Sequence, residues 1–572
     1  MSTPADVARA WLRSDPDAAD RAATEAALAA GDTAWLAAGF GPMLAFGTAG
    51  IRGEMGPGPS RMNRALVRRV SFGLGVVLGA EGDAARAQGV VVGHDARRNS
   101  RAFAEDTAAV LAGQGFTVYL FDGDVPTPVL AHAVRTLGTA AGVMVTASHN
   151  PPADNGYKVY ASDGAQVIPP LDAAIAAAAA GLDTTPDAPP LDGLRAAGRV
   201  RPVPARCWDA YLAGVLGLRV HTGATVRAVY TAMHGVGYAP LQRVLAAAGH
   251  APVIPVEAQV APDGAFPTVR FPNPEEPGAL DLAFATATAA GASLIIAHDP
   301  DADRLAVALP DGAGGWRRLT GNAVGLLLAD DLLAHRAPGD AQPLVVTTIV
   351  STALLQAVAA LHGAACQEVL TGFKWLAHAG MAWPGPFVLG FEEALGYSAG
   401  GLVRDKDGVS TALLLLDLAA WCEARGTTLA AHLDGLWRRV GYSATSQDNL
   451  VFRGADGPAR MAALTGALRA HPPTTLGGTP VATLRDLQAR EAHDLASGAR
   501  RPIALPASDV LAFDLADGSR VLVRPSGTEP KVKVYYEVRE PIADAEPVAA
   551  AAARAEARIA ALRADLAPHL RA

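Results

Sequence analysis

Cysteine, charge and long apolar runs are all scarce in this sequence of 572 residues. The three cysteines, Cys207, Cys366 and Cys422, are too few and too scattered for a disulfide framework or a CxxC metal site, which favours the reducing cytoplasm. The apolar stretches fall short of the roughly 20 residues that span a bilayer, and the first residues alternate charge with small side chains, unlike a secretory signal. We therefore expect a cytoplasmic protein with no membrane partner.

Positive charge is not in excess either. The 48 Lys and Arg residues are outnumbered by 56 Asp and Glu residues, so the formal net charge is −8. This balance argues against a nucleic-acid partner, because such binding usually needs a basic field. Charged residues make up only 18% of the chain and hydrophobic residues 50%, which is enough to fill several cores. At roughly 100–200 residues per domain, the length predicts three to five domains.

Short β-branched segments alternate with Ala- and Leu-rich segments through most of the chain, a pattern typical of α/β domains with parallel sheets. In the first third, the pattern predicts strands at 88–92, 117–121 and 142–146 and helices at 101–114 and 127–137. From about Ser443 onward strand-like segments predominate until a closing helical segment at 547–566. The last part of the chain is therefore predicted to be a smaller α+β domain.

The first segment suited to chemistry is Thr146-Ala-Ser-His-Asn-Pro151, at the end of a predicted strand. Ligands of parallel sheets bind at the carboxyl ends of strands, so Ser148 is a candidate nucleophile or phosphate carrier and His149 a candidate for orienting a phosphate. Asn155-Gly156 predicts a turn leading to a short strand that carries Lys158. An ordinary Ser/Asn turn followed by a solvated lysine also fits these residues.

Asp299, Asp301 and Asp303 alternate directly after an apolar strand predicted at 293–297. In an extended backbone, alternate side chains point to the same side, so the three carboxylates would face one cation. Hard oxygen ligands that leave room for a phosphate oxygen are typical of a Mg²⁺ site. The segment lacks the glycine and the terminal glutamate of an EF-hand loop. The alternative is a solvated acidic turn.

Two later loops contain residues suited to a phosphorylated sugar. Glu392 follows another apolar strand and can accept hydrogen bonds from sugar hydroxyls, although an acid there also suits the start of a helix. The segment Arg524-Pro-Ser-Gly-Thr-Glu-Pro-Lys531 has the hydroxyls, glycine and cations of a phosphate clamp, and a plain hairpin fits it equally well. Further single cations in or near glycine-containing loops are Arg52, Lys374 and Lys406.

Together these segments resemble the α-D-phosphohexomutase superfamily of phosphoglucomutases and phosphomannomutases, over about residues 46–537. The family's phosphoserine, metal, sugar and phosphate loops are similar to residues 146–151, 299–304, 391–396 and 524–530. The segments that look most like the phosphoglucomutase/phosphopentomutase branch are 231–237, 371–375 and 391–397. The resemblance implies an α/β protein of four domains around a central cleft, of which three are similar mixed α/β domains and the fourth is a smaller C-terminal α+β domain. We expect these domains at 1–215, 216–325, 326–442 and 443–572.

The resemblance also implies a mutase reaction. Ser148 would carry a phosphoryl group, coordinated by a Mg²⁺ ion, and donate it to a sugar 1-phosphate; the bisphosphate formed would then turn round and return its other phosphate. A sugar bisphosphate would act as activator. The implied metal ligands are Ser148, Asp299, Asp301 and Asp303, and the implied catalytic residues are Ser148, His149, Arg52 and Lys158. The implied substrate ligands are Arg304, Lys374, Glu392, Lys406, Arg524, Ser526, Gly527 and Thr528.

The sequence leaves the substrate and the general base open. The base is sought among His149, Lys158 and Lys406. Many hexose mutases have Glu-x-Ser in the sugar loop, whereas here Ala394 follows Glu392, which is compatible with a pentose or with broader tolerance. We expect interconversion of glucose 1- and 6-phosphate, or of pentose 1- and 5-phosphates, by a monomer or small homo-oligomer. The alternatives are a phosphomannomutase, a sugar-bisphosphate synthase, a phosphatase and, last, a non-catalytic sugar-phosphate sensor.

Overall fold

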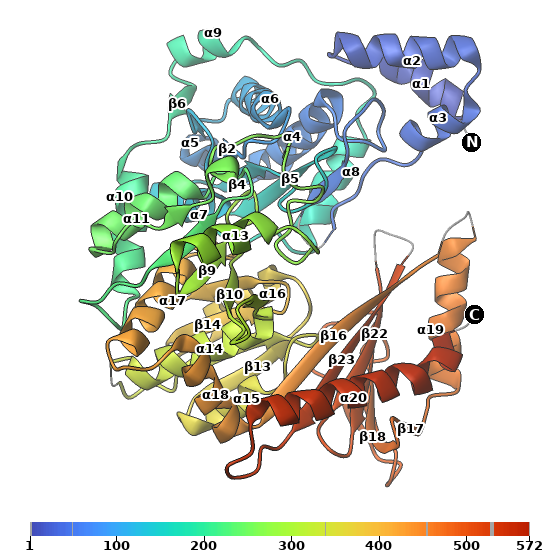
Figure 1. Ribbon diagram of the computed structural model, residues 1–572. Coiled ribbons are helices and arrows are strands. Elements are labelled where there is room, and N and C mark those ends of the chain that lie inside the picture. Colours follow the sequence, from blue (N-terminus) through green and yellow to red (C-terminus); the bar gives the residue numbers. More distant parts are fainter. Residues whose placement is uncertain (1–2, 48–49, 338, 453–455, 527–530, 571–572) are drawn as a thin grey trace. The chain divides into compact units, whose positions relative to one another are not determined.

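The computed structural model describes residues 3–47, 50–337, 339–452, 456–526 and 531–570. The chain, drawn in Figure 1, divides into two compact units. Unit 1 contains Met1–Gly321 and Gly372–Arg425, and unit 2 contains Asn322–Thr371 and Gly426–Ala572. Within the described ranges, no helix is long and apolar enough to cross a membrane.

A small helical cluster begins unit 1, formed by α1 (Pro4–Leu12), α2 (Ala18–Ala30) and α3 (Thr33–Gly39). Each helix starts at a side chain that accepts hydrogen bonds from the main-chain N–H groups of its first turn, namely Thr3, Asp17 and Asp32. Trp11 and Phe40 are buried in the core of this cluster, which reaches Ala65 in the next helix. The cluster therefore packs onto the first α/β layer.

The first sheet has the strand order β1-β5-β4-β2-β3-β6. Its strands are β1 (Ile51–Glu54), β2 (Val90–His94), β3 (Val118–Leu120), β4 (Ala141–Val145), β5 (Asp154–Ala161) and β6 (Val200–Pro202). The strands β4, β2, β3 and β6 are parallel, and β5 and β1 are added antiparallel. Every residue of β2 and β4 is buried, as expected for parallel strands covered on both faces.

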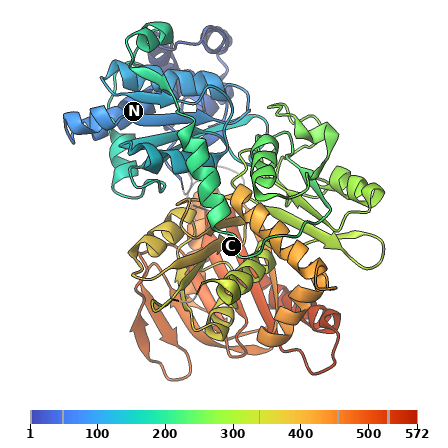
Figure 2. The same cartoon turned by 90° about the vertical axis from the view of Figure 1, so that its left-hand side faces the viewer.

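Helices cover this sheet on either side (Figures 1 and 2). The helices of this part of the chain are α4 (Arg64–Gly79), α5 (Asp83–Gln88), α6 (Ser100–Gly113), α7 (Thr127–Leu137), α8 (Leu171–Ala180), α9 (Leu191–Ala196) and α10 (Arg206–Gly217). The core beneath α4, α6 and α8 includes Leu66, Phe103 and Ile175 together with valines of β2 and β4. This packing fixes the carboxyl ends of β2 and β4 side by side.

The prediction of a turn at Asn155-Gly156 is wrong. Both residues lie inside β5 and pair with β1. A Cβ atom on Gly156 would lie 2.5 Å from the main-chain oxygen of Thr146 and 2.8 Å from that of Ile51. The glycine is therefore needed because main chain packs closely on both sides of the strand, and not because the chain reverses direction there.

The second sheet of unit 1 has the order β11-β10-β9-β7-β8. Its strands are β7 (Ala228–Thr231), β8 (Ile254–Pro255), β9 (Leu294–Ala297), β10 (Ala306–Pro310) and β11 (Trp316–Arg318). The helices of this segment are α11 (Tyr238–Ala248), α12 (Glu257–Val260) and α13 (Asp281–Ala290). The strands β7, β8 and β9 are parallel, whereas β9 and β10 are antiparallel. The turn between β9 and β10 carries the three aspartates.

Unit 1 is completed by residues that come later in the chain. They form α16 (Phe373–Ala382), β14 (Phe387–Glu392), β15 (Gly396–Ala399) and α17 (Gly408–Glu423). The strands β14 and β15 are an antiparallel hairpin. Almost every residue of α17 is buried, which agrees with a sequence that is apolar on nearly all sides.

Unit 2 combines a small parallel pair with a large antiparallel sheet. The first part consists of α14 (Gly321–His335), β12 (Leu344–Thr348), α15 (Leu355–Leu361), β13 (Ala365–Val369) and α18 (Leu429–Val440), with β12 parallel to β13. The large sheet contains β16 (Tyr442–Val451), β17 (Thr475–Leu476), β18 (Thr479–Asp486), β19 (Glu491–Asp494), β20 (Arg500–Pro502), β21 (Leu511–Leu515), β22 (Arg520–Pro525) and β23 (Lys531–Glu540). Its buried face packs against α19 (Gly457–Ala470) and α20 (Val548–Leu566), followed by a 3-10 turn at Ala567–Leu570.

A buried hydrogen-bond network joins the two parts of unit 2. Arg520 of β22 donates to Glu537 of β23 at 2.7 Å and to Glu368 of β13 at 2.7 Å. Glu537 also accepts from the hydroxyl of Thr352 at 2.5 Å and from the main-chain N–H of Ala353 at 3.0 Å. Because Arg520 and Glu537 are both buried, this pairing holds β13 and the segment after β12 to the large sheet.

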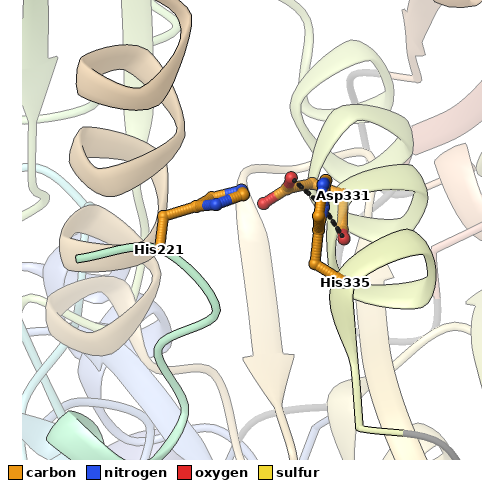
Figure 3. Close-up of side chains that lie close together, drawn as sticks. All are labelled: His221, Asp331 and His335. Atoms are coloured by element: carbon orange, nitrogen blue, oxygen red, sulfur yellow. Dashed lines mark hydrogen bonds and ion pairs between the residues drawn. The ribbon is translucent and has the colours of Figure 1, made fainter. Parts of the chain in front are cut away.

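His335 closes the last turn of α14. Its Nδ1 atom lies 3.0 Å from the carboxylate of Asp331 and 3.0 Å from the main-chain oxygen of the same residue (Figure 3). The imidazole thereby occupies one of the main-chain acceptors near the helix end. His221, also drawn in Figure 3, belongs to unit 1, where its ring lies 4.9 Å from the ring of Trp421.

Candidate active site

Ser148 lies in a tight turn three residues after β4. Its φ of 53° is in the left-handed region, which is uncommon for a residue other than glycine and is found most often where surrounding structure enforces it. The main-chain N–H of Ser148 donates to Oγ1 of Thr146 at 2.8 Å. That hydroxyl in turn donates to the carboxylate of Asp95 at 2.6 Å. Side-chain hydrogen bonds therefore set the shape of the turn.

The hydroxyl of Ser148 is buried between the imidazole of His149 and the turn at residues 299–304, here called the aspartate loop. Its Oγ donates to Oδ2 of Asp299 at 2.7 Å, and it lies 3.2 Å from Nδ1 of His149. Burial, together with the nearby positive charges of Arg304 and Arg52, holds the pKa of His149 well below its usual value. The imidazole is therefore neutral in this arrangement.

The three aspartates predicted as metal ligands come together. One carboxylate oxygen from each of Asp299, Asp301 and Asp303 lies within 4.8 Å of the others, and all three side chains are buried. The expected extended backbone is wrong, however, because the segment is a turn in which Ala302 has a φ of 54° and donates its N–H to the main-chain oxygen of Asp299. The turn, and not strand alternation, brings the carboxylates to one point.

The donor set fits a magnesium ion. Asp301 and Asp303 each have one buried carboxylate oxygen, Oδ1, with no hydrogen-bond partner among the described residues. Burying such an atom without a partner is costly. Burial and the two neighbouring carboxylates also raise the pKa of Asp299 well above its usual value. A hard divalent cation satisfies oxygens of this kind, and the Ser148 hydroxyl is a further oxygen donor at the same point.

Two lysines share the charge of the aspartate loop. Nζ of Lys158, on β5, lies 2.7 Å from Asp301 and 2.8 Å from Asp303, and Nζ of Lys406 lies 3.1 Å from Asp303 and 3.2 Å from Asp405. Burial alone would lower the pKa of each lysine, but the adjacent carboxylates raise both above the usual value. Both side chains are ammonium ions in this arrangement.

The sugar loop lies against the aspartate loop within unit 1. Arg304 forms a bridge to Gly396 and donates to the main-chain oxygen of Ala394 at 2.6 Å. Glu392, the last residue of β14, accepts the N–H of Gly372 at 2.9 Å, and burial raises its pKa. Lys374 stands at the start of α16, where burial lowers its pKa.

Arg52, on β1, approaches the serine loop, which is the segment 146–153 between β4 and β5. Its Nη1 atom lies 3.5 Å from the side-chain oxygen of Asn150, and its buried Nε has no hydrogen-bond partner among the described residues. The structure thus brings most of the predicted site residues together in unit 1. They are Arg52, Ser148, His149, Lys158, Asp299, Asp301, Asp303, Arg304, Glu392 and Lys406, with Lys374 beside Gly372.

The predicted phosphate loop belongs to unit 2. Arg524 lies near the end of β22, and the N–H of Ser526 donates to the main-chain oxygen of Lys531 at 2.8 Å. Gly527 and Thr528 lie outside the described residues. The four residues therefore remain predicted substrate ligands.

Several side chains of the site are absent from the sequence-based prediction. Thr127 donates to Asp301 at 2.6 Å, and Asp405 accepts from Tyr160 at 2.8 Å while pairing with Lys406. Asp95 and Arg97 follow the carboxyl end of β2 and reach the serine loop. Because ligands gather at the carboxyl ends of parallel strands, the position of this last pair directly after β2 is the signal in the sequence that points to it.

Four family models match the chain. They are phosphoglucomutase/phosphomannomutase alpha/beta/alpha domain I at residues 43–185, domain II at 209–312, domain III at 320–440 and the C-terminal domain at 477–555. Over 491 residues, the chain is 41% identical to a probable phosphomannomutase of Haemophilus influenzae, covering 84% of this chain and 93% of the relative. It is 38% identical over 552 residues to a probable phosphoribomutase of Schizosaccharomyces pombe, covering 92% of each.

A solved structure agrees with these matches. The crystal structure of a putative phosphomannomutase from Thermus thermophilus superposes with a TM-score of 0.69 at 25% identity, covering 92% of this chain and 99% of the other. The fold and its relatives define a phosphosugar mutase, an enzyme of the isomerase class. The chain belongs to the phosphoglucomutase/phosphomannomutase family. The predicted resemblance and the α/β fold class, with three α/β domains and a C-terminal domain, are confirmed.

Proposed function

We propose that this mutase interconverts a sugar 1-phosphate with its 6-phosphate, or a pentose 1-phosphate with its 5-phosphate, through a phosphoserine at Ser148. The observation that carries the proposal is the 2.7 Å hydrogen bond from the Ser148 hydroxyl to Asp299, within a cluster of three buried carboxylates. A serine with a phosphoryl group at this point would place phosphate oxygens beside the ligands of a divalent cation.

The residues of the aspartate loop would hold Mg²⁺ through Asp299, Asp301 and Asp303 and an oxygen on Ser148. When bound, this ion neutralises negative charge on the phosphoryl group during transfer. In the first transfer the sugar hydroxyl oxygen bonds to phosphorus, the bond between phosphorus and the serine oxygen breaks, and the proton lost by the sugar hydroxyl is balanced by one taken up by the serine oxygen. The second transfer reverses these changes at the other end of the bisphosphate, so protons and phosphoryl groups balance over the cycle.

The protein's own groups account for the remaining parts of the step. His149, whose Nδ1 atom lies 3.2 Å from the Ser148 oxygen, is proposed to orient that oxygen and the phosphoryl group on it. Arg52, Lys158 and Arg304 supply positive charge around the serine and aspartate loops. Such fixed charges need little rearrangement when negative charge develops in the transition state.

The sugar would be bound by residues on both sides of the aspartate loop. Glu392 and Lys374 are proposed to bind its hydroxyls, with Arg304 and Lys406 close to the reacting phosphate. Arg524, Ser526, Gly527 and Thr528 are proposed to hold the other phosphate. The four domains of the chain are proposed to span 1–215, 216–325, 326–442 and 443–572. A catalytic amount of sugar bisphosphate would keep Ser148 phosphorylated.

The enzyme is proposed to accept both hexose and pentose phosphates because of the side chain at position 394 in the sugar loop, residues 391–396. Arg304 fixes the main chain of Ala394, so the loop keeps its shape while its side chain offers no hydroxyl. The relatives named a probable phosphomannomutase and a probable phosphoribomutase support activity on both hexose and pentose phosphates. Restoring a hydroxyl by Ala394→Ser should raise the ratio of hexose to pentose kcat/KM about tenfold, the worth of one hydrogen bond.

The enzyme is proposed to be cytoplasmic and to act as a monomer or small homo-oligomer. No nucleic-acid or membrane partner is proposed for it. The three cysteines are free, which supports a reducing compartment.

Product analysis distinguishes the alternatives. A bisphosphate synthase would accumulate bisphosphate, a phosphatase would release inorganic phosphate, and a sensor would bind sugar phosphates without turnover.

The test is an assay with Mg²⁺, a trace of sugar bisphosphate and a panel of hexose and pentose 1-phosphates, following isomers, bisphosphate and free phosphate. Wild-type protein should form isomer and carry phosphate on the peptide containing Ser148, as read by mass spectrometry. Ser148→Ala should lose more than about 10³-fold in kcat, because covalent catalysis is removed. Undiminished activity of Ser148→Ala would contradict the phosphoserine mechanism.

A further inference from the structure

The guanidinium of Arg97 binds the main chain in and directly after the serine loop at four points. Nη2 donates to the main-chain oxygens of Ser148 at 2.6 Å and Asn150 at 2.5 Å, and Nη1 donates to those of Pro151 at 2.8 Å and Asp154 at 3.2 Å. The Arg97 side chain has no exposed surface. One buried cation thus binds four main-chain oxygens between Ser148 and the first residue of β5.

Asp95 holds the other side of the same turn. One carboxylate oxygen accepts the main-chain N–H of Arg97 at 3.0 Å and the hydroxyl of Ser100 at 2.7 Å. The other accepts the hydroxyl of Thr146, whose oxygen accepts the N–H of Ser148. Both main-chain polar groups of Ser148 are therefore tied, directly or through Thr146, to the segment that follows β2.

A loop from the second sheet covers Arg97. The ring of Phe266 lies 4.9 Å from the guanidinium carbon, a cation–π contact. Gly264 forms a bridge with Arg97, and a Cβ atom on this glycine would lie 2.6 Å from the main-chain oxygen of Ala96. Phe266 itself has a left-handed φ of 51°, so the loop is bent to bring its ring onto the cation. The same loop leads to α13 and then to the aspartate loop.

We propose that Arg97 is a positioning residue for Ser148, held by Asp95 and covered by Phe266. Arg97 touches main-chain oxygens and not the serine hydroxyl, so it acts by fixing where the hydroxyl lies. It keeps Ser148 in its left-handed conformation with Oγ at the aspartate loop, and the Phe266 loop couples that position to the part of the chain that carries the aspartates. This inference rests on the proposed role of Ser148.

The planar fork of the guanidinium is essential to this role. The two terminal nitrogens of Arg97 donate hydrogen bonds to four carbonyl groups, whereas a lysine ammonium is a single point charge with three donors. Loosening the loop should slow phosphoryl transfer more than it weakens substrate binding, because a displacement of about 1 Å of a reacting group costs roughly 10²-fold in rate. We therefore expect kcat to fall about 10²-fold in Arg97→Ala and Arg97→Lys, with KM changed less than about threefold.

The experiment compares these two variants with Phe266→Leu, Ser148→Ala and the control Arg98→Ala, whose side chain is exposed at the neighbouring position. Activity, the rate at which sugar bisphosphate loads phosphate onto Ser148, and the melting temperature are measured for each. Loading should slow in parallel with kcat for the Arg97 variants, fall several-fold for Phe266→Leu, and remain unchanged for Arg98→Ala. Added guanidinium ion should restore part of the loading rate of Arg97→Ala.

Rescue by guanidinium separates positioning from a general loss of stability, since a merely destabilised enzyme gains nothing from the ion. If Arg97→Ala does not fold, folded Arg97→Lys decides, and wild-type loading in that variant overturns the proposal. If Ser148→Ala is inactive but the Arg97 variants load phosphate at the wild-type rate, only the positioning role of Arg97 is overturned. An active Ser148→Ala instead overturns the proposed function, and the inference with it.

Discussion

Lys158 places its ammonium group 2.7 Å from Asp301 and 2.8 Å from Asp303, and none of the three side chains has exposed surface. The lysine thus compensates carboxylates that a metal ion would also compensate. Metal and ammonium together would neutralise the crowded acids, so the charge of this site depends on both. The two can be separated by experiment.

Replacing Lys158 by methionine should destabilise the metal-free protein. Removal of one partner of a buried ion pair typically costs about 3–5 kcal/mol, because the other charge is left uncompensated. Mg²⁺ should restore more of the free energy of unfolding in Lys158→Met than in wild type. Urea denaturation with and without millimolar Mg²⁺ measures both quantities. The control is Arg101→Ala, which breaks an exposed pair with Glu105 and should cost less than about 1 kcal/mol. If Mg²⁺ raised the free energy of unfolding equally in wild type and in Lys158→Met, the ammonium group and the metal ion would not compensate the same carboxylates.

Removal of the metal should stop turnover. Chelation of divalent cations, or Asp303→Asn, is expected to lower the isomerisation rate at least about 10²-fold, because charge stabilisation by a metal ion is worth several kcal/mol. Added Mg²⁺ should recover the chelated wild type and leave Asp303→Asn slow. A coupled assay of product formation follows both. Full activity after thorough chelation would mean that the aspartates serve another purpose.

Much of the fold is predictable from local sequence patterns. The helix predicted at 127–137 matches α7 at both ends, because Pro128 suits its first turn and Gly138 ends it in a left-handed conformation. The predicted strands at 88–92, 117–121 and 142–146 fall on β2, β3 and β4 within two residues. The helices before the first strand, α1 to α3, were not predicted, although each begins at a residue type that commonly caps helices, Thr3, Asp17 or Asp32.

The site is less predictable than the fold. Ser148 and the three aspartates stand out because they follow strands, whereas the contact of Ser148 with Asp299 joins residues 151 positions apart and follows from packing. Asp95 and Arg97 acquire their role only through burial and through the carbonyl groups that the serine turn offers them. Asn155-Gly156 misleads because the dipeptide common in turns is also what a crowded strand requires.

A second buried cluster should matter for stability and not for catalysis. On α17, Asp417 accepts two hydrogen bonds from Arg219, at 2.7 and 2.8 Å, and pairs with His250 at 2.7 Å. Asp417→Ala leaves both partners uncompensated and should lower the free energy of unfolding by about 3–5 kcal/mol with an unchanged KM. Urea denaturation and steady-state kinetics measure these effects. Glu423→Ala, at the exposed end of the same helix, is the matched control. A large change in KM would mean that the cluster reaches the site.

Acid sensitivity should arise in part from His132 on α7. Burial, with the nearby charge of Arg135, lowers the pKa of His132 to about 4, while an unfolded histidine titrates near 6.5. Between these two pKa values the unfolded chain binds a proton at His132 that the folded protein does not bind. The contribution of His132 to the free energy of unfolding is therefore fully present above about pH 7 and is lost as the pH falls towards 4. The loss from this residue amounts to at most about 3 kcal/mol.

The comparison of wild type with His132→Gln isolates this effect from that of other histidines. The free energy of unfolding, measured in urea at pH 7.5 and at pH 5, should decline less in the variant. An identical decline in both proteins would indicate that His132 is protonated in the folded state. The measurement does not depend on catalysis.

The interleaved order of the two units has a consequence for how the enzyme is made. Asp299, Asp301 and Asp303 emerge from the ribosome about a hundred residues before Lys406 and β15, which complete their surroundings in unit 1. At roughly 5–20 residues per second, a nascent chain would wait about 5–20 s with this acidic turn only partly compensated. Lys158 and Arg304, both already synthesised, are then cations within reach, and a magnesium ion captured at that stage would assist folding before it assists catalysis.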